Sequence, residues 1–421
     1  MKMNGFWKQS AGSGIATAIR IACAFITNKF LAMVMGPVGF AIAGQLQNLI
    51  NLGQGTSSLA LQNGWVSLTA RHKNEEDKLG PIWRGGFRIS VYASIGTAIF
   101  FVLFAFIAPL QTLFPGIPPR YMQAAILFAV PGVISLSVIA ICSAVMNGLS
   151  DYKRWAIITA GSSILNCLWV ILFIHFHAMS ILSAIATQSI VSSFFAFFVA
   201  HRGGFRYRRF YAKLRAEFRP WKGYAVMGII PMILTPALYM FMRSYIGNHF
   251  GWDAAGFWQG ALRISDFFNV GFSSVLGVVL LPRLSAATSK IEFQKTLSAL
   301  LLRVMILAFV LFGFLFFVRD YLILFALSEK FLPLSSLLPI QLVGDFFKSG
   351  CWCLGLALVA RKETVAFISV EIASDLFFTL LTIFGAAAWK YQAPFYAYAI
   401  ENAICFISLF ILTRRLSWKN L

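Results

Sequence analysis

Charged side chains interrupt long apolar segments in the C-terminal half of the chain. Arg263 and Asp266 lie three residues apart in the segment 252–284, so on a helix they would share one face. A charge at mid-depth in a bilayer costs at least about 2.5–3.5 kcal/mol. That cost indicates a water-filled cavity or a charged ligand beside the two side chains. A structural pair that ties helices together is the alternative.

Further acids follow at helical spacing in the same half. Asp345 and Lys348 repeat the three-residue spacing with the signs reversed, and the structural alternative applies to them as well. Glu371 and Asp375 are four residues apart and would share a face. If these segments move a solute across a membrane, the candidates for binding a coupling ion are Asp266, Asp345, Glu371, Asp375 and Glu401.

The apolar segments of the N-terminal half contain cations and no acid. Arg20 and Lys29 are nine residues apart, so they would face opposite sides of a straight helix, with Arg20 deeper from one end and Lys29 nearer the other.

In the C-terminal half, Arg243 follows Pro231 and Pro236, which are expected to kink their helix. Arg243 and Arg303 could instead reach a headgroup layer as interfacial side chains. The candidates for binding an anionic substrate are Arg20, Lys29, Arg243, Arg263 and Lys348.

Carboxamide side chains are unusually frequent in the first two apolar segments. They are Asn28, Gln45, Gln47, Asn48, Asn51, Gln54, Gln62 and Asn63. Helix-to-helix hydrogen bonds account for some of them, but so many indicate at least one wet face. Because arginine and lysine bind phosphate while amides hydrogen-bond hydroxyls, a cationic cavity rich in amides suits a phosphate-linked sugar.

The segments that carry these residues have the length of membrane-spanning helices. The chain of 421 residues is 59% hydrophobic and 12% charged, whereas soluble domains have about 25% charged residues. The apolar runs are about 20 residues long, enough to cross a hydrocarbon core. We therefore predict an all-α polytopic membrane protein of about twelve transmembrane helices: 13–35, 40–68, 87–110, 121–148, 155–176, 180–201, 223–247, 254–282, 298–319, 332–360, 364–388 and 394–413.

Basic residues are concentrated in alternate loops, which explains the net charge of +20 without a nucleic-acid partner. The basic residues of the opposite loops are only four: Arg120, Arg319, Lys330 and Lys390. By the positive-inside rule, both termini are expected in the cytoplasm. The N-terminal segment lacks the pattern of a cleavable signal peptide, so the first span is expected to stay in place. These features predict a multi-pass protein of a bacterial inner membrane.

The longest basic loop divides the chain near its middle. It predicts an N-terminal six-helix lobe at 1–201, a basic cytoplasmic linker at 202–222 and a C-terminal six-helix lobe at 223–421. Aromatic side chains alternate with the cations of the linker: Phe205, Tyr207, Phe210, Tyr211, Phe218 and Trp221. Such a mixture can stack on single-stranded nucleic acid, but a position between two spans favours contact with anionic lipid headgroups. Six spans per half, each beginning inside, indicate parallel repeats with a substrate site between them.

No apparatus for catalysis or cofactor binding is evident. The sequence lacks a glycine-rich phosphate loop with its lysine, and no cofactor is expected. The cysteines all fall within apolar spans, so no disulfide framework is predicted; they are Cys23, Cys142, Cys167, Cys351, Cys353 and Cys405. Cys351 and Cys353 would point to different sides of a helix, which is unsuitable for a metal. We expect neither a metal site nor an enzyme.

A resemblance to a known family is strongest in the run Gly256-Phe257-Trp258-Gln259-Gly260 through Ile264-Ser265-Asp266. This run resembles the Wzx-type flippases for polyprenyl-diphosphate-linked oligosaccharides, most of all their enterobacterial common antigen (lipid III) branch. Further matches are Lys29 with Gly36-Pro37, Leu281-Pro282, Lys330-Phe331, and Gln341-Leu342-Val343-Gly344-Asp345 with Lys348. The similarity covers nearly the whole chain but weakens through the third to sixth spans, so the sugar of that branch does not carry over.

The resemblance implies the two-lobed fold of the multidrug/oligosaccharidyl-lipid/polysaccharide exporters, with alternating access around a central cationic cavity. It implies that an undecaprenyl diphosphate-linked oligosaccharide moves from the cytoplasmic to the periplasmic leaflet for O-antigen or enterobacterial common antigen assembly. A proton or sodium gradient could drive the movement, and membrane lipids, a polysaccharide polymerase and a chain-length regulator would be partners.

The rival interpretation is a cation-coupled multidrug exporter of similar architecture. Such a protein should place acids toward cationic drugs in its N-terminal half, where this chain has Arg20 and Lys29. A channel or scaffold agrees less well with two similar halves and charges paired at mid-depth.

Overall fold

The computed structural model describes residues 3–58, 61–173, 178–205, 217–285, 289–361 and 363–415. These residues are almost entirely helical, and they pack as two compact units. Unit 1 comprises Met1–Val34 and Ile42–Phe241, and unit 2 comprises Met35–Ala41 and Met242–Leu421. The chain therefore enters unit 2 for a short turn between its first two spans, returns to unit 1, and crosses again within a helix.

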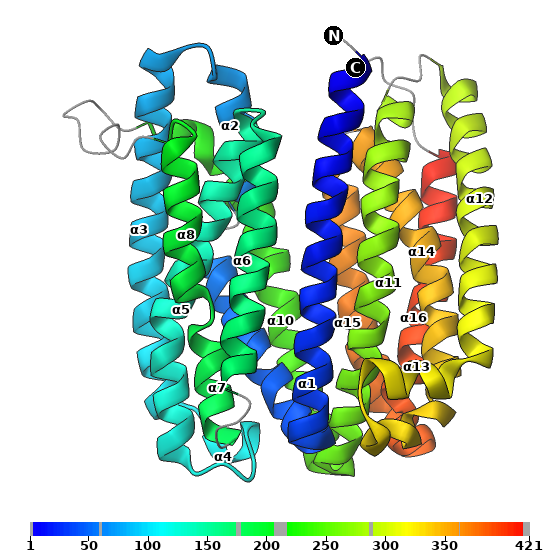
Figure 1. The fold of residues 1–421 in the computed structure, drawn as a ribbon. Helices are drawn as coiled ribbons and strands as arrows, with labels where there is room; N and C mark the ends of the chain where they lie inside the picture. Colours follow the sequence, from blue (N-terminus) through cyan, green and yellow to red (C-terminus); the bar gives the residue numbers. More distant parts are fainter. Residues whose placement is uncertain are drawn as a thin grey trace. The chain divides into compact units, whose positions relative to one another are not determined.

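Unit 1 is a bundle of long helices that lie side by side (Figure 1). After α1 (Met3–Ser58) come α2 (Gln62–His72), α3 (Glu76–Ile107), α4 (Leu110–Leu113), α5 (Pro119–Gly148), α6 (Tyr152–Leu172), α7 (Ala178–Thr187), α8 (Ser189–Arg202), the short 3-10 helix η1 (Arg219–Trp221) and the first part of α10 (Lys222–Phe250).

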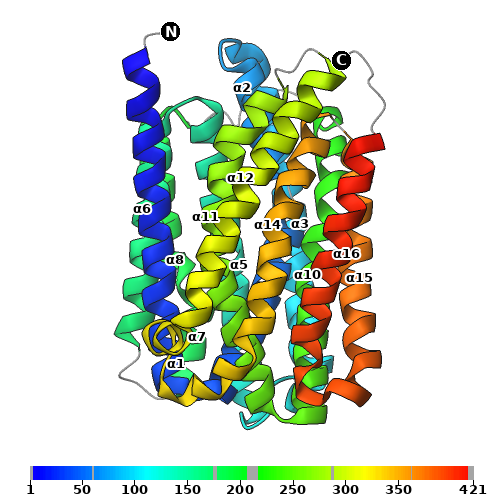
Figure 2. The same ribbon diagram turned by 90° about the vertical axis from the view of Figure 1, so that its right-hand side faces the viewer.

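Unit 2 is built in the same way from the C-terminal helices (Figure 2). They are the end of α10, then α11 (Trp252–Ser285), α12 (Lys290–Phe317), α13 (Arg319–Ala326), the 3-10 helix η2 (Glu329–Ser336), α14 (Leu338–Ala360), α15 (Thr364–Trp389), η3 (Lys390–Gln392) and α16 (Ala393–Arg415).

The predicted membrane spans coincide with these helices. Eight helices within the described residues are long and apolar enough to cross a membrane, and two of the eight, Gly14–His72 and Val365–Arg415, each contain two predicted spans. Helices α10 and α11 coincide with the predicted spans 223–247 and 254–282. The prediction of a polytopic all-helical membrane protein is confirmed.

Three of the predicted spans are not single α-helices in the structure. The span predicted at 40–68 is divided, because α1 ends at Ser58 and α2 begins at Gln62. The span predicted at 180–201 is divided between α7 and α8. The span predicted at 332–360 begins with η2, which contains Pro333, and its α-helix starts at Leu338. A proline ring removes a backbone donor and favours the first turn of a helix over its interior.

Gly36 ends the first span by reversing the chain. Its backbone angles are φ 64° and ψ −173°, a conformation that is nearly exclusive to glycine. Pro37 follows and starts the next helical segment, so α1 is two helices joined by a sharp turn (Figure 1). The second half of the chain has a comparable turn between α10 and α11, where Gly251 has φ 94°.

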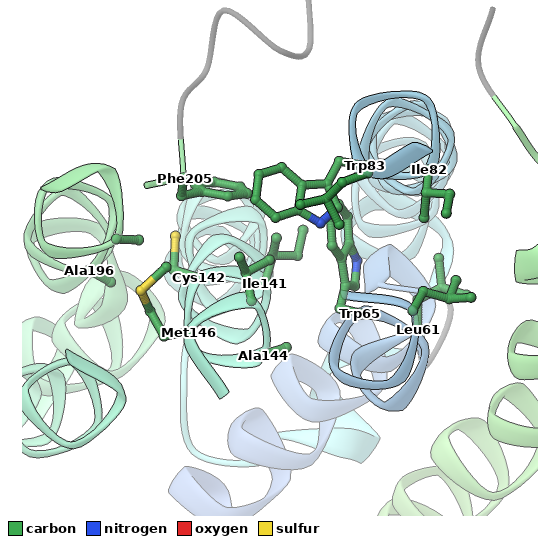
Figure 3. Packing of buried hydrophobic residues seen from close by; sticks show 14 of the residues in the cluster. Leu61, Trp65, Ile82, Trp83, Ile141, Cys142, Ala144, Met146, Ala196 and Phe205 are labelled. Carbon is green, nitrogen blue, oxygen red and sulfur yellow. The ribbon is translucent and has the colours of Figure 1, made fainter. Parts of the chain in front are cut away.

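A cluster of large aromatic side chains fills the core of unit 1 near α2. Trp65, Trp83 and Phe205 pack there with Ile141 and other apolar side chains of the cluster (Figure 3). The Trp83 indole donates a hydrogen bond to the Thr69 hydroxyl at 3.0 Å. This core joins α2, α3 and α5 at one end of the bundle.

Two aromatic residues of the predicted linker belong to this core. Trp221 is fully buried, its ring centroid lies 4.9 Å from that of Trp65, and its indole donates to the Ile82 carbonyl at 3.1 Å. Phe205 is only 4% exposed. The expectation that the linker aromatics lie on lipid headgroups is therefore wrong for these two, because both pack inside unit 1. Residues 206–216 of the linker lie outside the described residues.

Candidate functional site

Asp345 is the centre of a polar network inside unit 2. Its side chain is fully buried on α14 and accepts two hydrogen bonds from other helices. The Ser265 hydroxyl of α11 donates to one carboxylate oxygen at 2.7 Å, and the Tyr398 hydroxyl of α16 donates to the other at 2.8 Å. Gln341, one helical turn before Asp345, donates from its amide to the Ser265 hydroxyl at 3.0 Å. The network therefore ties α11, α14 and α16 together.

Lys348 lies one turn further along α14 and is half-buried. Its ammonium nitrogen is 5.3 Å from the centre of the Tyr398 ring, within the range of a cation–π interaction. Tyr398 thus contacts both members of the pair predicted from their spacing: its hydroxyl bonds to Asp345 and its ring faces Lys348.

Arg263 and Asp266 form the ion pair expected from their spacing on α11. The guanidinium Nη1 and the carboxylate Oδ2 are 3.4 Å apart. The Asp266 side chain is 58% exposed and that of Arg263 is 25% exposed, so the carboxylate has free surface beside the pair. Between them in the sequence lies Ser265, which connects this face of α11 to Asp345.

Arg243 is buried within unit 2 instead of reaching a headgroup layer. Its side chain is 1% exposed on α10, and its guanidinium donates to the Gln259 side-chain oxygen. The guanidinium carbon also lies 5.7 Å from the Trp258 ring, which stacks on Phe378. The interfacial alternative for Arg243 is therefore wrong, because its partners are the polar and aromatic side chains of α11.

The remaining predicted acids lie on α15 and α16. Glu401 is 8% exposed and accepts hydrogen bonds from the Ser374 hydroxyl and, at 2.6 Å, from the Asn402 amide. Glu371 is exposed and Asp375 is half-buried. Two kinds of carboxylate result: Asp345 and Glu401 are enclosed by hydrogen-bond donors, and the others are more open.

The two N-terminal cations lie on the first segment of α1. Arg20 is exposed on this helix and Lys29 is half-buried. They belong to unit 1, whereas Arg243, Arg263 and Lys348 belong to unit 2. The predicted substrate ligands are thus divided between the two units.

The carboxamides of the second segment of α1 have two different roles. Gln45 is fully buried and donates to the Met240 carbonyl of α10 at 3.1 Å, a helix-to-helix bond of the expected kind. Gln47 donates to Asn51 at 3.1 Å along the exposed side of the helix. Asn51 of this segment is exposed, as are Gln62 and Asn63 at the start of α2.

Three residues of the polar network were not predicted as site residues from the sequence: Ser265, Gln341 and Tyr398. Hydroxyl and amide residues occur throughout membrane spans, so their types alone give no signal, but Ser265 and Gln341 belong to the runs that carry the family resemblance. The four-residue spacing of Gln341 and Asp345 on one helical face was available. Within the described residues, no group of three or more His, Cys, Asp or Glu side chains is placed to hold a metal ion, and the six cysteines are free.

Comparisons with known proteins extend over the whole chain. No family model matches it. The sequence is 25% identical to the lipid III flippases of Escherichia coli (strain K12) and of Shigella flexneri over 430 aligned residues, which cover 97% of this chain and 99% of each relative. The resemblance inferred from the sequence motifs is confirmed by these relatives.

Solved structures share the fold at low sequence identity. An inward-facing multidrug resistance MATE family transporter of the MOP superfamily has a TM-score of 0.69 at 14% identity, with 94% of this chain and 97% of that chain covered. The lipid II flippase MurJ in an inward closed conformation also has a TM-score of 0.69, at 15% identity, with 96% and 87% covered. The predicted fold class, a polytopic all-helical protein of about twelve helices in two lobes, is confirmed.

Proposed function

We propose that the protein is a flippase that translocates a polyprenyl diphosphate-linked oligosaccharide from the cytoplasmic to the periplasmic leaflet of a bacterial inner membrane. The observation that carries the proposal is the end-to-end similarity to curated lipid III flippases. The shared fold with the lipid II flippase MurJ agrees with it. The product would serve assembly of a surface polysaccharide of O-antigen or enterobacterial common antigen type.

The cations of the spans supply the chemistry for the headgroup. In the proposed mechanism Arg20, Lys29, Arg263 and Lys348 attract the diphosphate, while the polyprenyl tail stays in lipid. Arginine binds phosphate oxygens in a bidentate manner and lysine binds them as a point charge. Arg243, also predicted as a ligand, is buried against Gln259 and Trp258. We therefore assign it to positioning of α11.

Ion coupling would involve carboxylates of unit 2. Asp345 and Glu401 accept hydroxyl hydrogen bonds in buried positions, and Asp266 is exposed beside Arg263. Glu371 and Asp375 are the remaining candidates on α15. In the proposed cycle, a proton or sodium ion binds among these acids in one state and leaves in the other, so that a gradient drives the alternation.

The cell context follows from the same proposal. Both termini lie in the cytoplasm, and the basic loops face anionic lipid on that side. The protein carries out no covalent chemistry, and a polysaccharide polymerase with its chain-length regulator would receive the product. In this scheme the chain order gives an N-terminal lobe at 1–201, a linker at 202–222 and a C-terminal lobe at 223–421, whereas by packing the turn at 35–41 belongs to unit 2 and α10 belongs to unit 1 up to Phe241.

A multidrug exporter is the second candidate, because MATE transporters share the fold. That likeness, at 14% identity, supports the architecture alone. The cations on the first segment of α1 favour an anionic substrate over a cationic drug.

Complementation separates the two candidates. Expression in a strain that lacks its lipid-linked oligosaccharide flippase should restore the surface polysaccharide. Arg263→Ala and Lys29→Ala should fail at matched membrane levels, while Lys290→Ala, which alters an exposed lysine at the start of α12, should behave as wild type. Failure of the wild type together with resistance to cationic drugs would replace the proposal by the exporter.

A further inference from the structure

The motif Gly256–Gly260 has a structural use that its resemblance to flippases did not explain. All five residues lie near the start of α11, and each packs closely against another part of unit 2. We call this motif, together with Leu327 and Phe331, the socket. The segment Met35–Ala41, which contains the turn at Gly36, is called the turn segment and belongs to the same unit.

Backbone packs on backbone where the turn segment meets the socket. A Cβ atom added at Gly256 would lie 2.3 Å from the Pro37 carbonyl oxygen and 2.7 Å from the Pro37 Cα. Such distances leave no room for a side chain, and neither atom belongs to a flexible group that could move aside. Glycine at position 256 is therefore required for this approach.

Aromatic contacts also hold the turn segment against the socket. Phe40 of the turn segment is 2% exposed, and its ring centroid lies 5.5 Å from that of Phe331 in an edge-to-face arrangement. Phe257 approaches the same Phe331 ring at 6.3 Å. Burial of the Phe40 ring removes apolar surface from contact with solvent or headgroups and so favours the bound position of the turn segment. The Lys330 side chain covers the turn, since a Cβ on Gly36 would lie 3.4 Å from its Cδ.

The rest of the motif fixes the base of the socket. Gln259 accepts the hydrogen bond from the buried Arg243 guanidinium, and the Trp258 ring contacts both that guanidinium and the stacked ring of Phe378. Gly260 faces Leu327 and Phe331 so closely that an added Cβ would be 2.9 Å from the Leu327 Cδ1. The motif is thus packed against Arg243 of α10, Phe378 of α15, Leu327 just after α13 and Phe331 of η2.

The chain connects the turn segment to unit 1 at both of its ends. The helical segments before and after the turn segment belong to unit 1, whereas the turn segment itself is packed in unit 2. The second crossing between the units lies in α10 between Phe241 and Met242, one residue from the Met240 carbonyl that accepts the Gln45 bond. Any movement of one unit against the other must be absorbed at these joints.

We propose that the turn segment is a permanent anchor that stays seated in the socket through the transport cycle, so that the two units pivot about the joints on either side of it. The Gly256–Gly260 motif then positions the pivot and does not contact substrate. Gly36, whose backbone conformation is open to little besides glycine, lies inside the turn segment and shapes the turn next to the joint at Val34–Met35. The transport arm of the test below rests on the proposed function.

Cross-linking tests whether the seat must open. Phe40→Cys and Phe331→Cys are introduced together in a background whose native cysteines are replaced by alanine, and are joined by a short bifunctional thiosulfonate, with the linked peptide verified by mass spectrometry. If the turn segment is a permanent anchor, the linked protein should transport at a rate within about twofold of the unlinked protein. A covalent link between two parts that never separate does not restrict the movement of the units. Loss of transport that reduction reverses would overturn the anchor and indicate a latch that must open.

Thiol labelling tests the contact between the turn segment and the socket in the absence of substrate. In purified protein that carries Phe40→Cys alone, the buried thiol should react with a maleimide slowly. Adding Gly256→Ala should raise the rate at least about tenfold, since labelling of a buried group follows the population of the locally opened state. Gly271→Ala on the same helix, where an added Cβ meets nothing within 4 Å, is the matched control. Equal rates in the two variants would overturn the anchor even if the proposed function failed.

Discussion

The hydroxyl of Tyr398 donates a hydrogen bond to the buried carboxylate of Asp345 at 2.8 Å. The same tyrosine ring lies beside the Lys348 ammonium group. A residue of α16 therefore links an acid and a base of α14 that were predicted as a pair from their spacing. Ser265 holds the second oxygen of the carboxylate from α11, so three helices depend on one acid.

Removing the Tyr398 hydroxyl should destabilise unit 2. Tyr398→Phe leaves one oxygen of a buried carboxylate without this donor, which should cost about 1–3 kcal/mol. Thermal unfolding in detergent measures the effect as a lowered Tm. Tyr391→Phe is the control, because Tyr391 is 41% exposed. Equal Tm values for the two variants would contradict the role of the network.

The structural and the substrate-binding interpretations of Arg263 differ in a double substitution. Because Asp266 is also a candidate for ion coupling, the double variant is compared with Asp266→Ala alone. If the Arg263–Asp266 ion pair only ties the fold together, Arg263→Ala with Asp266→Ala should transport as well as Asp266→Ala. Under the proposed function the arginine also binds the diphosphate, so the double variant should stay at least about tenfold below Asp266→Ala, a loss of about 1.4 kcal/mol in transition-state stabilisation. Equal transport in the two variants would identify a structural pair.

Two glycine substitutions should shift stability in opposite directions. Gly36→Ala places a side chain at φ 64° and ψ −173°, which should cost about 1–3 kcal/mol. Gly96→Ala lies within α3, where an added Cβ meets nothing within 4 Å, and should stabilise by up to about 1 kcal/mol through helix propensity. Thermal denaturation compares the two. A Gly36→Ala protein as stable as wild type would show that the turn can relax.

Trp221 should be a principal anchor of the chain segment that follows the basic linker. Trp221→Ala removes a fully buried indole from the core of unit 1 and its bond to Ile82, and should cost about 3–5 kcal/mol. Trp352→Ala, which alters a 37% exposed indole on α14, is the matched control. The comparison requires only Tm values, and a smaller loss at Trp221 than at Trp352 would contradict the packing described.

The spans and some of the charge pairing could be predicted because they depend on local sequence. Runs of apolar residues and the Gly36-Pro37 stop mark helix lengths, and a three-residue spacing brings Arg263 next to Asp266 on one helical face. The network at Asp345 could not be predicted in this way. Its partners are 80 and 53 residues away in the sequence, and only the packing of α11, α14 and α16 brings them together.

Arg243 and Trp221 show the same limit in another form. An arginine near a helix end and a tryptophan in a basic loop are both typical of a membrane interface. The structure buries both, because Gln259 and Trp258 receive the arginine and the Ile82 carbonyl receives the indole. Residue type and depth in the membrane suggested that both side chains are exposed. Both are buried because a segment distant in the sequence supplies a hydrogen-bond partner.

Translocation by the purified protein tests the central claim most directly. Proteoliposomes that contain a polyprenyl diphosphate-linked oligosaccharide in one leaflet are sampled over time with a lectin or glycosidase that reaches only the opposite leaflet. The account predicts that wild-type protein exposes the sugar well above the rate in protein-free vesicles, and that Arg263→Ala reduces this rate at least about tenfold. A wild-type rate equal to that of protein-free vesicles would contradict the account.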